Sequence, residues 1–312
     1  MSVIEIDRKL AALTPGPPQR CKGLTMIPLF ESEEGLDDYF TLDEALARGL
    51  GEVTEVSEGG SVPELRFRNR ADKPVLLVDG EELVGSKQNR ILNMSILAPA
   101  RSETLIPVSC VESGRWAWRA RSSGTSNRAI YSKLRSKKVA QVSASLHEGG
   151  RRSSDQQSIW DDIALKSVRM NAFCDTGASS ALYERHREDL EEFVTALKPQ
   201  DRQAGAIFVI NQRPVGIEVF QSARLFACFF PKLVRSYGLD AIDESDAPAN
   251  SDDPHAVDVA EMLSGVREAQ ASRFQAVGLG EDIRLEGGSM LGAALAADGN
   301  LVHLAAFDRT WA

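Results

Sequence analysis

The residues best suited to chemistry lie close together, between Asp79 and Trp118. A first cluster combines carboxylates, cations and side-chain amides within ten positions: Glu81, Glu82, Lys87, Gln88, Asn89 and Arg90. A second cluster follows two apolar runs: Cys110, Glu112, Arg115, Trp116 and Trp118. A sheet does not need acids, bases and amides at this density in order to fold. We therefore interpret the stretch as the lining of a polar pocket.

The cationic, amide and aromatic side chains are suited to an anionic ligand that contains a ring. Arginine and lysine hold phosphate or carboxylate groups, arginine through its two-pronged geometry. Side-chain amides form hydrogen bonds with a sugar or a base edge, and an indole stacks on a nucleobase. We assign ligand binding to six residues: Lys87, Gln88, Asn89, Arg90, Arg115 and Trp116.

Three carboxylates are the candidate catalytic groups: Glu81, Glu82 and Glu112. A general acid or base must bring its carboxyl group to the reacting atoms. Neighbouring side chains of an extended segment point to opposite faces, so we expect Glu81 and Glu82 to do separate jobs. One would serve the site, and the other would face solvent or pair with a base.

Cys110 is a candidate nucleophile, with one feature against it. A nucleophilic thiol needs a base or a cation nearby to lower its pKa. Arg115 is near in the sequence but no histidine is, and many lone cysteines are small core residues. The four histidines are widely spaced, so we predict no metal site, and the sequence identifies no cofactor.

Short apolar runs separated by turn residues surround the polar stretch and predict strands. In the first half these strands span 24–30, 51–57, 62–68, 74–79, 81–85, 90–97 and 103–111, with short helices at 3–13 and 41–49. Ser86–Asn89 would then be a loop held between two strands, a common location for binding residues. A polar hairpin with surface ion pairs, each worth under about 1 kcal/mol, would contain the same residue types.

Helical spacing and turn signals predict a different organisation after Trp118. We expect a loop at 119–127, helices at 128–147, 155–173 and 177–197, a hairpin of strands 206–210 and 215–220, a helix at 221–236, a surface loop at 240–253, a helix at 255–274, and strands at 282–286, 290–296 and 301–307. The predicted fold is α+β, with an N-terminal antiparallel sandwich or barrel-like half, central helices, and a C-terminal mixed half with antiparallel hairpins. The expected domains are a β-rich domain at 1–120, a helical segment at 121–200, and an α+β segment at 201–312 that can form one unit with the helices.

The composition limits the classes of function. The 312 residues carry a net charge of −9, which disfavours a nucleic-acid partner. Because no run of about 18 apolar residues is present, we expect no membrane span. The N-terminus lacks the apolar core of a signal peptide and the four cysteines are scattered, so we expect a cytoplasmic protein. The oligomeric state stays open, with a homodimer as one option.

The charge is unevenly distributed along the chain. Residues 113–138 contain eight Arg or Lys and no acid, whereas residues 240–261 contain eight acids and no Arg or Lys. Solvated surface explains both segments. Alternatively, the basic segment forms a rim that attracts a phosphate-bearing ligand.

The sequence that starts at Gly80, GEELVGSKQNRILNMSIL, and the later IPVSCVESGRW resemble the ARG- and rhodanese-phosphatase-associated protein domain family, in which ARG stands for ADP-ribosylglycohydrolase. The family motif corresponds here to Gly80, Glu81, Glu82, Gly85, Lys87, Gln88, Asn89, Arg90, Cys110, Glu112, Arg115 and Trp116. Ser86 stands where the motif has alanine. The family is named after neighbouring genes, and the resemblance implies a link to NAD or ADP-ribose metabolism without implying a mechanism.

Three functions remain compatible with these residues. The first is an enzyme that acts on an ADP-ribose-like or other nucleotide-derived ligand, with a small phosphate-bearing molecule as its partner. The second is a non-catalytic module that binds such a ligand. The third is a scaffold in which Glu82, Lys87 and Arg90 only lock a hairpin through a buried polar network.

Overall fold

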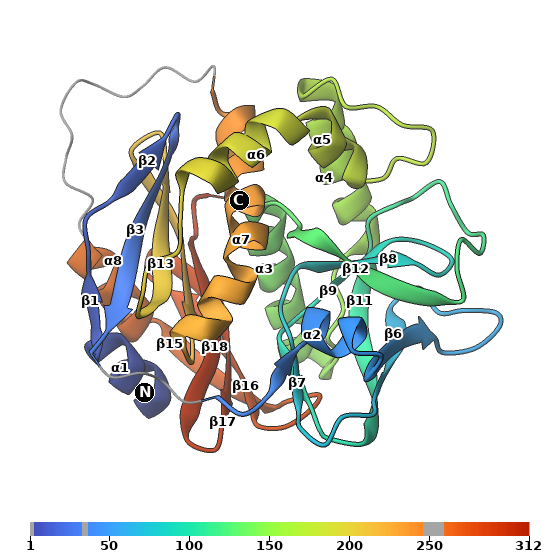
Figure 1. Cartoon of the computed structure of the whole chain (residues 1–312), viewed down its shortest axis with the longest axis horizontal. Coiled ribbons are helices and arrows are strands. Elements are labelled where there is room, and N and C mark those ends of the chain that lie inside the picture. The colour runs from blue at the N-terminus through green and yellow to red at the C-terminus, as the bar shows by residue number, and fades with distance from the viewer. Residues whose placement is uncertain (1–2, 33–36, 246–258, 312) are drawn as a thin grey trace.

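A nine-stranded sheet and a closed six-stranded barrel form the framework of the protein, joined by helices (Figure 1). The computed structural model describes residues 3–32, 37–245 and 259–311. Its helices are α1 (Ile4–Ala11), α2 (Leu42–Ala47), α3 (Ser132–Gly149), α4 (Gln156–Arg169), α5 (Ser180–Arg185), α6 (Arg187–Ala196), α7 (Ala223–Asp243) and α8 (Val259–Glu268).

The nine-stranded sheet is antiparallel and combines strands from the two ends of the chain. Its order is β1 (Leu13–Pro15), β3 (Leu24–Glu31), β13 (Gln203–Ile210), β14 (Arg213–Phe220), β18 (Asn300–Asp308), β17 (Met290–Ala297), β16 (Glu281–Gly287) and β15 (Gln270–Gln275), with β2 (Gln19–Cys21) paired to β3. Strand β13 is buried along its whole length. Both faces of the strand are buried because neighbouring side chains point to opposite faces of the sheet. Phe208 packs in the core beneath α7, and Ile207 packs in a second core beneath α1 and α8.

The barrel consists of strands from the middle of the first half and closes with a later one. Its order is β11 (Ser102–Cys110), β6 (Glu64–Asn69), β5 (Gly51–Glu55), β12 (Ser122–Ala129), β8 (Glu81–Gly85) and β9 (Arg90–Leu92). A small sheet of β10 (Ile96–Ala98), β7 (Val75–Leu77) and β4 (Phe40–Thr41) adjoins it. Side chains such as Val53, Phe67 and Leu83 fill the interior.

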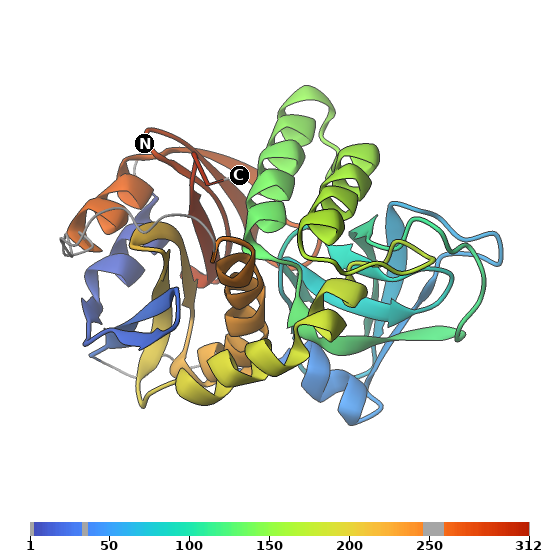
Figure 2. The same cartoon turned by 90° about the horizontal axis from the view of Figure 1, so that it is seen from above.

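Helices α3 and α7 lie between the barrel and the large sheet, as the view from above shows (Figure 2). The interface contains charged groups as well as apolar ones: Arg135 and Lys138 of α3 have no solvent exposure. Gly80, in the turn before β8, permits the close approach of α3. Its φ is +79°, and a Cβ there would lie 2.9 Å from the Arg135 side chain, so a larger residue would be excluded on both grounds.

The predicted α+β class is confirmed, and so is the antiparallel, barrel-like N-terminal half. The predicted hairpin is also present as β13 and β14. Its two turn residues, Asn211 and Gln212, both have positive φ, as the tight turns of β-hairpins require. The three-part domain division remains a prediction. The strand pairing adds that residues 13–31 join the C-terminal sheet and residues 122–129 join the barrel.

The predictions for two segments are wrong because strands form there. The loop expected at 119–127 contains most of β12, which pairs with β5 and β8 although its composition is polar. The helix expected at 255–274 ends at Glu268, and Gln270–Gln275 is a strand paired with β16. Residues 255–258 lie outside the described residues. In both cases a partner strand decided the conformation, since β-propensity depends strongly on context.

The charged segments also differ in part from the predicted solvated surface. Helix α7 continues to Asp243, and Asp240 is a buried partner of Lys166, with 2.7 Å between the charged atoms. Residues 246–258 of the acidic segment lie outside the described residues. In the basic segment, Arg135 and Lys138 are buried beside the large sheet, whereas Arg121 is exposed near the barrel.

Candidate functional site

The predicted site residues divide between the two ends of β8. Glu81 and Glu82 begin the strand, and the loop 86–89 follows its other end. Around that loop and the adjoining Arg90, the fold brings together residues from two further segments, 55–61 and 112–118. We call this region the barrel mouth. It comprises Glu55, Gly59, Gly60, Ser61, Lys87, Gln88, Asn89, Arg90, Glu112, Arg115, Trp116 and Trp118.

A buried ion pair closes the interior of the barrel at the mouth. Arg90 Nη1 donates to Glu55 Oε1 at 2.9 Å, and the side chains are 0% and 1% exposed. Arg90 Nη2 also donates to the Ser61 carbonyl at 3.1 Å. Gly60 lies directly over the pair, since a Cβ there would be 3.2 Å from Glu55 Oε2. The loop 59–61 therefore covers the buried ion pair of Arg90 and Glu55.

Glu55 was not among the predicted site residues, although its position in the sequence indicates a buried carboxylate. Val53 and Glu55 are two residues apart on β5, so their side chains point to the same face of the strand. Val53 is in the barrel core, and a carboxylate on that face must be buried and therefore paired. Trp118 was noted but not assigned, and its contacts place it at the mouth.

The ammonium group of Lys87 lies near the rings of two exposed tryptophans. Its ammonium group is 5.3 Å from the centroid of Trp116 and 5.2 Å from that of Trp118, and it donates to the Gly59 carbonyl at 2.9 Å. The indoles are 45% and 38% exposed. Arg121 lies 4.9 Å from the Trp118 ring. The surface of the mouth is thus aromatic, and Lys87, which the indoles contact, is only 9% exposed.

Glu112 joins the two sequence clusters. Its Oε2 accepts hydrogen bonds from Arg115 Nη2 at 2.6 Å and from the Asn89 backbone N–H at 3.0 Å. Gln88 Nε2 donates to the Glu112 carbonyl at 3.2 Å. Burial alone would raise the pKa of Glu112, but the hydrogen bonds from Arg115 and Asn89 outweigh it and lower the pKa below its usual value. Glu112 is therefore ionised at neutral pH.

The two adjacent glutamates lie elsewhere and each has a basic partner. Glu81 Oε1 accepts from Lys232 Nζ at 2.6 Å, and Glu82 Oε2 accepts from Arg128 Nε at 2.5 Å. Both residues are buried. Burial raises the pKa of Glu81 although Lys232 opposes the effect. Among the described residues, neither carboxylate forms a hydrogen bond or ion pair with the barrel mouth, so the expected single working carboxylate is not found there.

Cys110 is a buried residue at the end of β11. Its thiol has no exposure, and Sγ lies 3.4 Å from the Glu112 carbonyl. Burial raises the pKa of Cys110, which disfavours the thiolate that a nucleophile needs. The surroundings are those of a core cysteine.

Several buried polar atoms at the mouth have no protein partner. Among the described residues they are Glu55 Oε2, Gln88 Oε1, Arg90 Nε and Arg115 Nε. Buried polar atoms in folded proteins nearly always form a hydrogen bond, with protein, water or a ligand. The mouth therefore has unused hydrogen-bonding capacity beside its exposed indoles.

A search of protein-family models identifies one family. The model of the ARG and Rhodanese-Phosphatase-superfamily-associated Protein domain matches residues 12–307. The chain belongs to this family. The match includes both sheets and the barrel mouth, so all these features lie within the family's domain. Searches of curated proteins and of solved structures found no significant match.

The described residues were also compared with the requirements of a metal site and of a membrane span. Within residues 3–32, 37–245 and 259–311, no three His, Cys, Asp or Glu side chains are arranged to hold a metal ion. In the same residues, the helices are too short or too polar to span a bilayer.

Proposed function

We propose that the protein binds a phosphate-bearing nucleotide ligand at the barrel mouth, with ADP-ribose and NAD-derived compounds as the leading candidates. The observation that carries this proposal is the position of the Lys87 ammonium between two solvent-exposed indoles. An indole face stacks on a base, and a cation beside it attracts phosphate. The family's association with ARG proteins supports the same ligand class.

Binding is better supported than processing. Of the three candidate catalytic carboxylates, Glu112 lies at the mouth. Its Oε2 accepts hydrogen bonds from Arg115 and from the Asn89 backbone N–H. Glu81 and Glu82 pair with Lys232 and Arg128 instead. A general acid or base must reach the reacting atoms, and the exposed side chains of the mouth are the two indoles.

A second candidate function is a structural polar network, because the charged groups of the motif have internal partners. Arg90 with Glu55, Glu81 with Lys232, and Glu82 with Arg128 are all mostly buried pairs. Removing one member of such a pair costs stability whether or not a ligand binds. The exposure of Trp116 and Trp118 is not explained by this function.

Calorimetric titration and thermal shift with ADP-ribose, NAD, ADP and ribose 5-phosphate test the proposal. We expect a nucleotide to raise the melting temperature, because a ligand that binds the folded state stabilises it. Stacking contributes about 1–3 kcal/mol per base, so Trp116→Ala should weaken binding by about 5- to 150-fold. Lys87→Ala should weaken it as well.

Arg101→Ala is the matched control. Arg101 is an exposed arginine that precedes β11, at the end of that strand opposite the mouth, and its loss should leave the affinity unchanged. The proposal fails if no probe binds the wild type, or if Trp116→Ala and Lys87→Ala bind as tightly as Arg101→Ala. A lower melting temperature for Lys87→Ala with unchanged affinity would support the structural network.

A further inference from the structure

Helix α4 presents apolar side chains to solvent that the rest of the chain leaves uncovered. Leu165 and Val168 are 63% and 59% exposed, and Phe173, just beyond the end of the helix, is 70% exposed. Leu165 and Val168 are three residues apart, so their side chains share one side of the helix. Single exposed apolar side chains are ordinary, whereas adjoining ones mark an interaction surface.

The opposite side of α4 is firmly attached to the fold. Ile159 packs in the large core, and Lys166 Nζ donates to Asp240 Oδ1 at 2.7 Å. At the start of the helix, Gln156 forms hydrogen bonds of 2.8 Å with both the N–H and the carbonyl of Cys110. Figure 2 shows α3 and α4, in green and yellow-green, projecting together from the rest of the molecule. The exposed side of α4 is therefore a fixed surface that other molecules can reach.

Opposite charges flank the apolar side chains at equal distances. Asp161 lies four residues before Leu165 and Arg169 lies four residues after it, and both are exposed. At a rise of about 1.5 Å per residue, each charge is about 6 Å from Leu165 along the helix axis. Arg169 binds Asp243 through Nε and Nη2, yet its side chain remains 54% exposed. We call this surface the α4 face: Gln157, Asp161, Ala164, Leu165, Val168 and Arg169.

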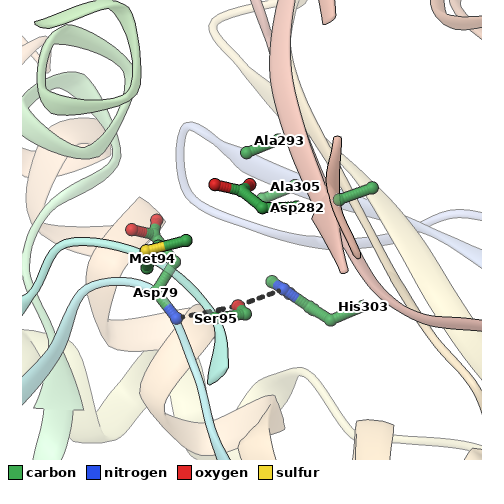
Figure 3. Close-up of a pocket in the computed structure, with 8 residues that line it drawn as sticks. Asp79, Met94, Ser95, Asp282, Ala293, His303 and Ala305 are labelled. Atoms are coloured by element: carbon green, nitrogen blue, oxygen red, sulfur yellow. Dashed lines mark hydrogen bonds between the residues drawn. The ribbon is translucent and has the colours of Figure 1, made fainter. Parts of the chain in front are cut away.

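The small cavity between the barrel and the large sheet, by contrast, is closed to partners. Its volume is about 10 Å³, which is room for roughly one water. Ser95 Oγ lies 2.8 Å from His303 Nδ1 there, and the cavity residues Asp79, Asp282 and His303 are buried (Figure 3). These groups join the two parts of the fold, whereas the α4 face points away from it.

We propose that the α4 face binds the α4 face of a second copy of this chain, as an antiparallel helix pair whose two-fold axis passes at Leu165. Turning the helix end to end about that axis brings Asp161 level with Arg169 of the partner subunit, and Arg169 level with the partner's Asp161. The order acid, apolar, base is thus its own complement, as a two-fold interface requires. The two Leu165 side chains bury each other at the centre.

This interface does not rest on ligand binding at the barrel mouth, because the α4 face and the mouth share no residue. Both binding partners carry the same surface, so an unrelated protein is not needed to cover Leu165 and Val168. Dimerisation and ligand binding can therefore be measured separately, and either can fail without the other.

Light scattering after size-exclusion chromatography, over a dilution series of the full chain, tests the interface. We expect a dimer that dissociates on dilution. Leu165→Asp should weaken it by about 100-fold or more, because both copies lose a buried leucine and gain a charge at the axis. Asp161→Arg should weaken it by about 5- to 10-fold, because two exposed ion pairs are replaced by like charges.

Ile4→Asp is the matched control. Ile4 is an apolar residue of α1 that is 62% exposed, almost the same as Leu165, and its replacement should leave the dimer unchanged. Comparing the two variants separates loss of the α4 face from a general effect of removing an exposed apolar side chain.

Engineered disulfides test the antiparallel arrangement. In a background with the exposed Cys174 and Cys228 changed to serine, Ala164→Cys should form a dimer cross-link on mild oxidation, because residue 164 lies beside the axis. Gln157→Cys should not, because its two copies would be about 24 Å apart along the helix axes, too far for a disulfide. The background chain without an added cysteine gives the baseline.

The proposal is overturned by any of three results. The first is a wild type that stays monomeric at every concentration, which would leave the α4 face to a different partner. The second is a Leu165→Asp variant that dimerises as tightly as Ile4→Asp. The third is a Gln157→Cys chain that cross-links as readily as Ala164→Cys, which would exclude the two-fold axis at Leu165.

Discussion

The barrel mouth and the interface between the barrel and the large sheet both bury charged residues, but Asp79 and Glu218 at the interface are paired differently from Glu55 at the mouth. At the interface both oxygens of Asp79 and both oxygens of Glu218 accept hydrogen bonds from side chains of the chain itself. At the mouth Glu55 Oε2 lacks a protein partner. The exposed indoles also belong to the mouth.

This difference shows that residue types do not by themselves distinguish a structural network from a binding site. A carboxylate whose acceptor capacity is used within the chain joins two parts of the fold. A carboxylate or amide with unused capacity, next to exposed aromatic rings, is available to a ligand. Four variants test whether the two regions really differ in this way.

Arg135→Met should produce the largest effect, because it leaves Asp79 and Glu218 buried without their shared cation. Breaking a buried ion pair by removing one partner costs about 3–5 kcal/mol, and urea unfolding should show a loss of this size. Arg101→Met, at an exposed site, should change the unfolding free energy by less than about 0.5 kcal/mol. An equal, small change in both variants would contradict a structural role for the interface network.

Arg90→Met should cost less than Arg135→Met, because Arg90 forms an ion pair with one carboxylate, whereas Arg135 forms ion pairs with both Asp79 and Glu218. A double-mutant cycle with Glu55→Gln should give a coupling of about 1–3 kcal/mol in urea unfolding. A coupling near zero would mean that the pair at the mouth is not a structural unit.

Lys138→Met tests the interface through pH. Burial lowers the pKa of Lys138 to about 8 even though Asp79 opposes the effect, whereas an unfolded lysine titrates near about 10.4. Between these values the unfolded chain binds more protons, so the wild-type stability should rise with pH relative to Lys138→Met, by about 3 kcal/mol over the whole interval. Lys137→Met, which removes a partly exposed neighbouring lysine, should show no such rise, and a flat difference for Lys138→Met would refute the assignment.

Trp118→Ala should have the smallest effect on folding. The indole is 38% exposed and contacts Lys87 and Arg121, and cation–π contacts at exposed sites are worth about 0.5–1 kcal/mol. Thermal and urea unfolding should therefore change by less than about 1 kcal/mol. A loss as large as that of Arg135→Met would show that the tryptophans are structural and not a ligand surface.

Sequence patterns predicted those strands and helices whose own residues show a regular apolar spacing or end in a recognisable turn. The alternating run at 62–68 corresponds to β6, and the Asn211–Gln212 turn joins β13 to β14. Strands β12 and β15 were missed because their residues are polar and become strands by pairing with β8 and β16. The long helix expected at 177–197 is interrupted at His186, between α5 and α6.

The sequence by itself determined the fold class, the family and the stretch in which the chemistry-bearing residues are concentrated. Local composition and spacing carry that information, because period and turn residues act over a few positions. Only the tertiary structure decided which charge meets which: Glu81 with Lys232, Arg90 with Glu55, and Ser95 with His303. The partners of the first and last pairs lie 151 and 208 residues apart, and no local rule connects residues that only the packing of two sheets brings within hydrogen-bond distance.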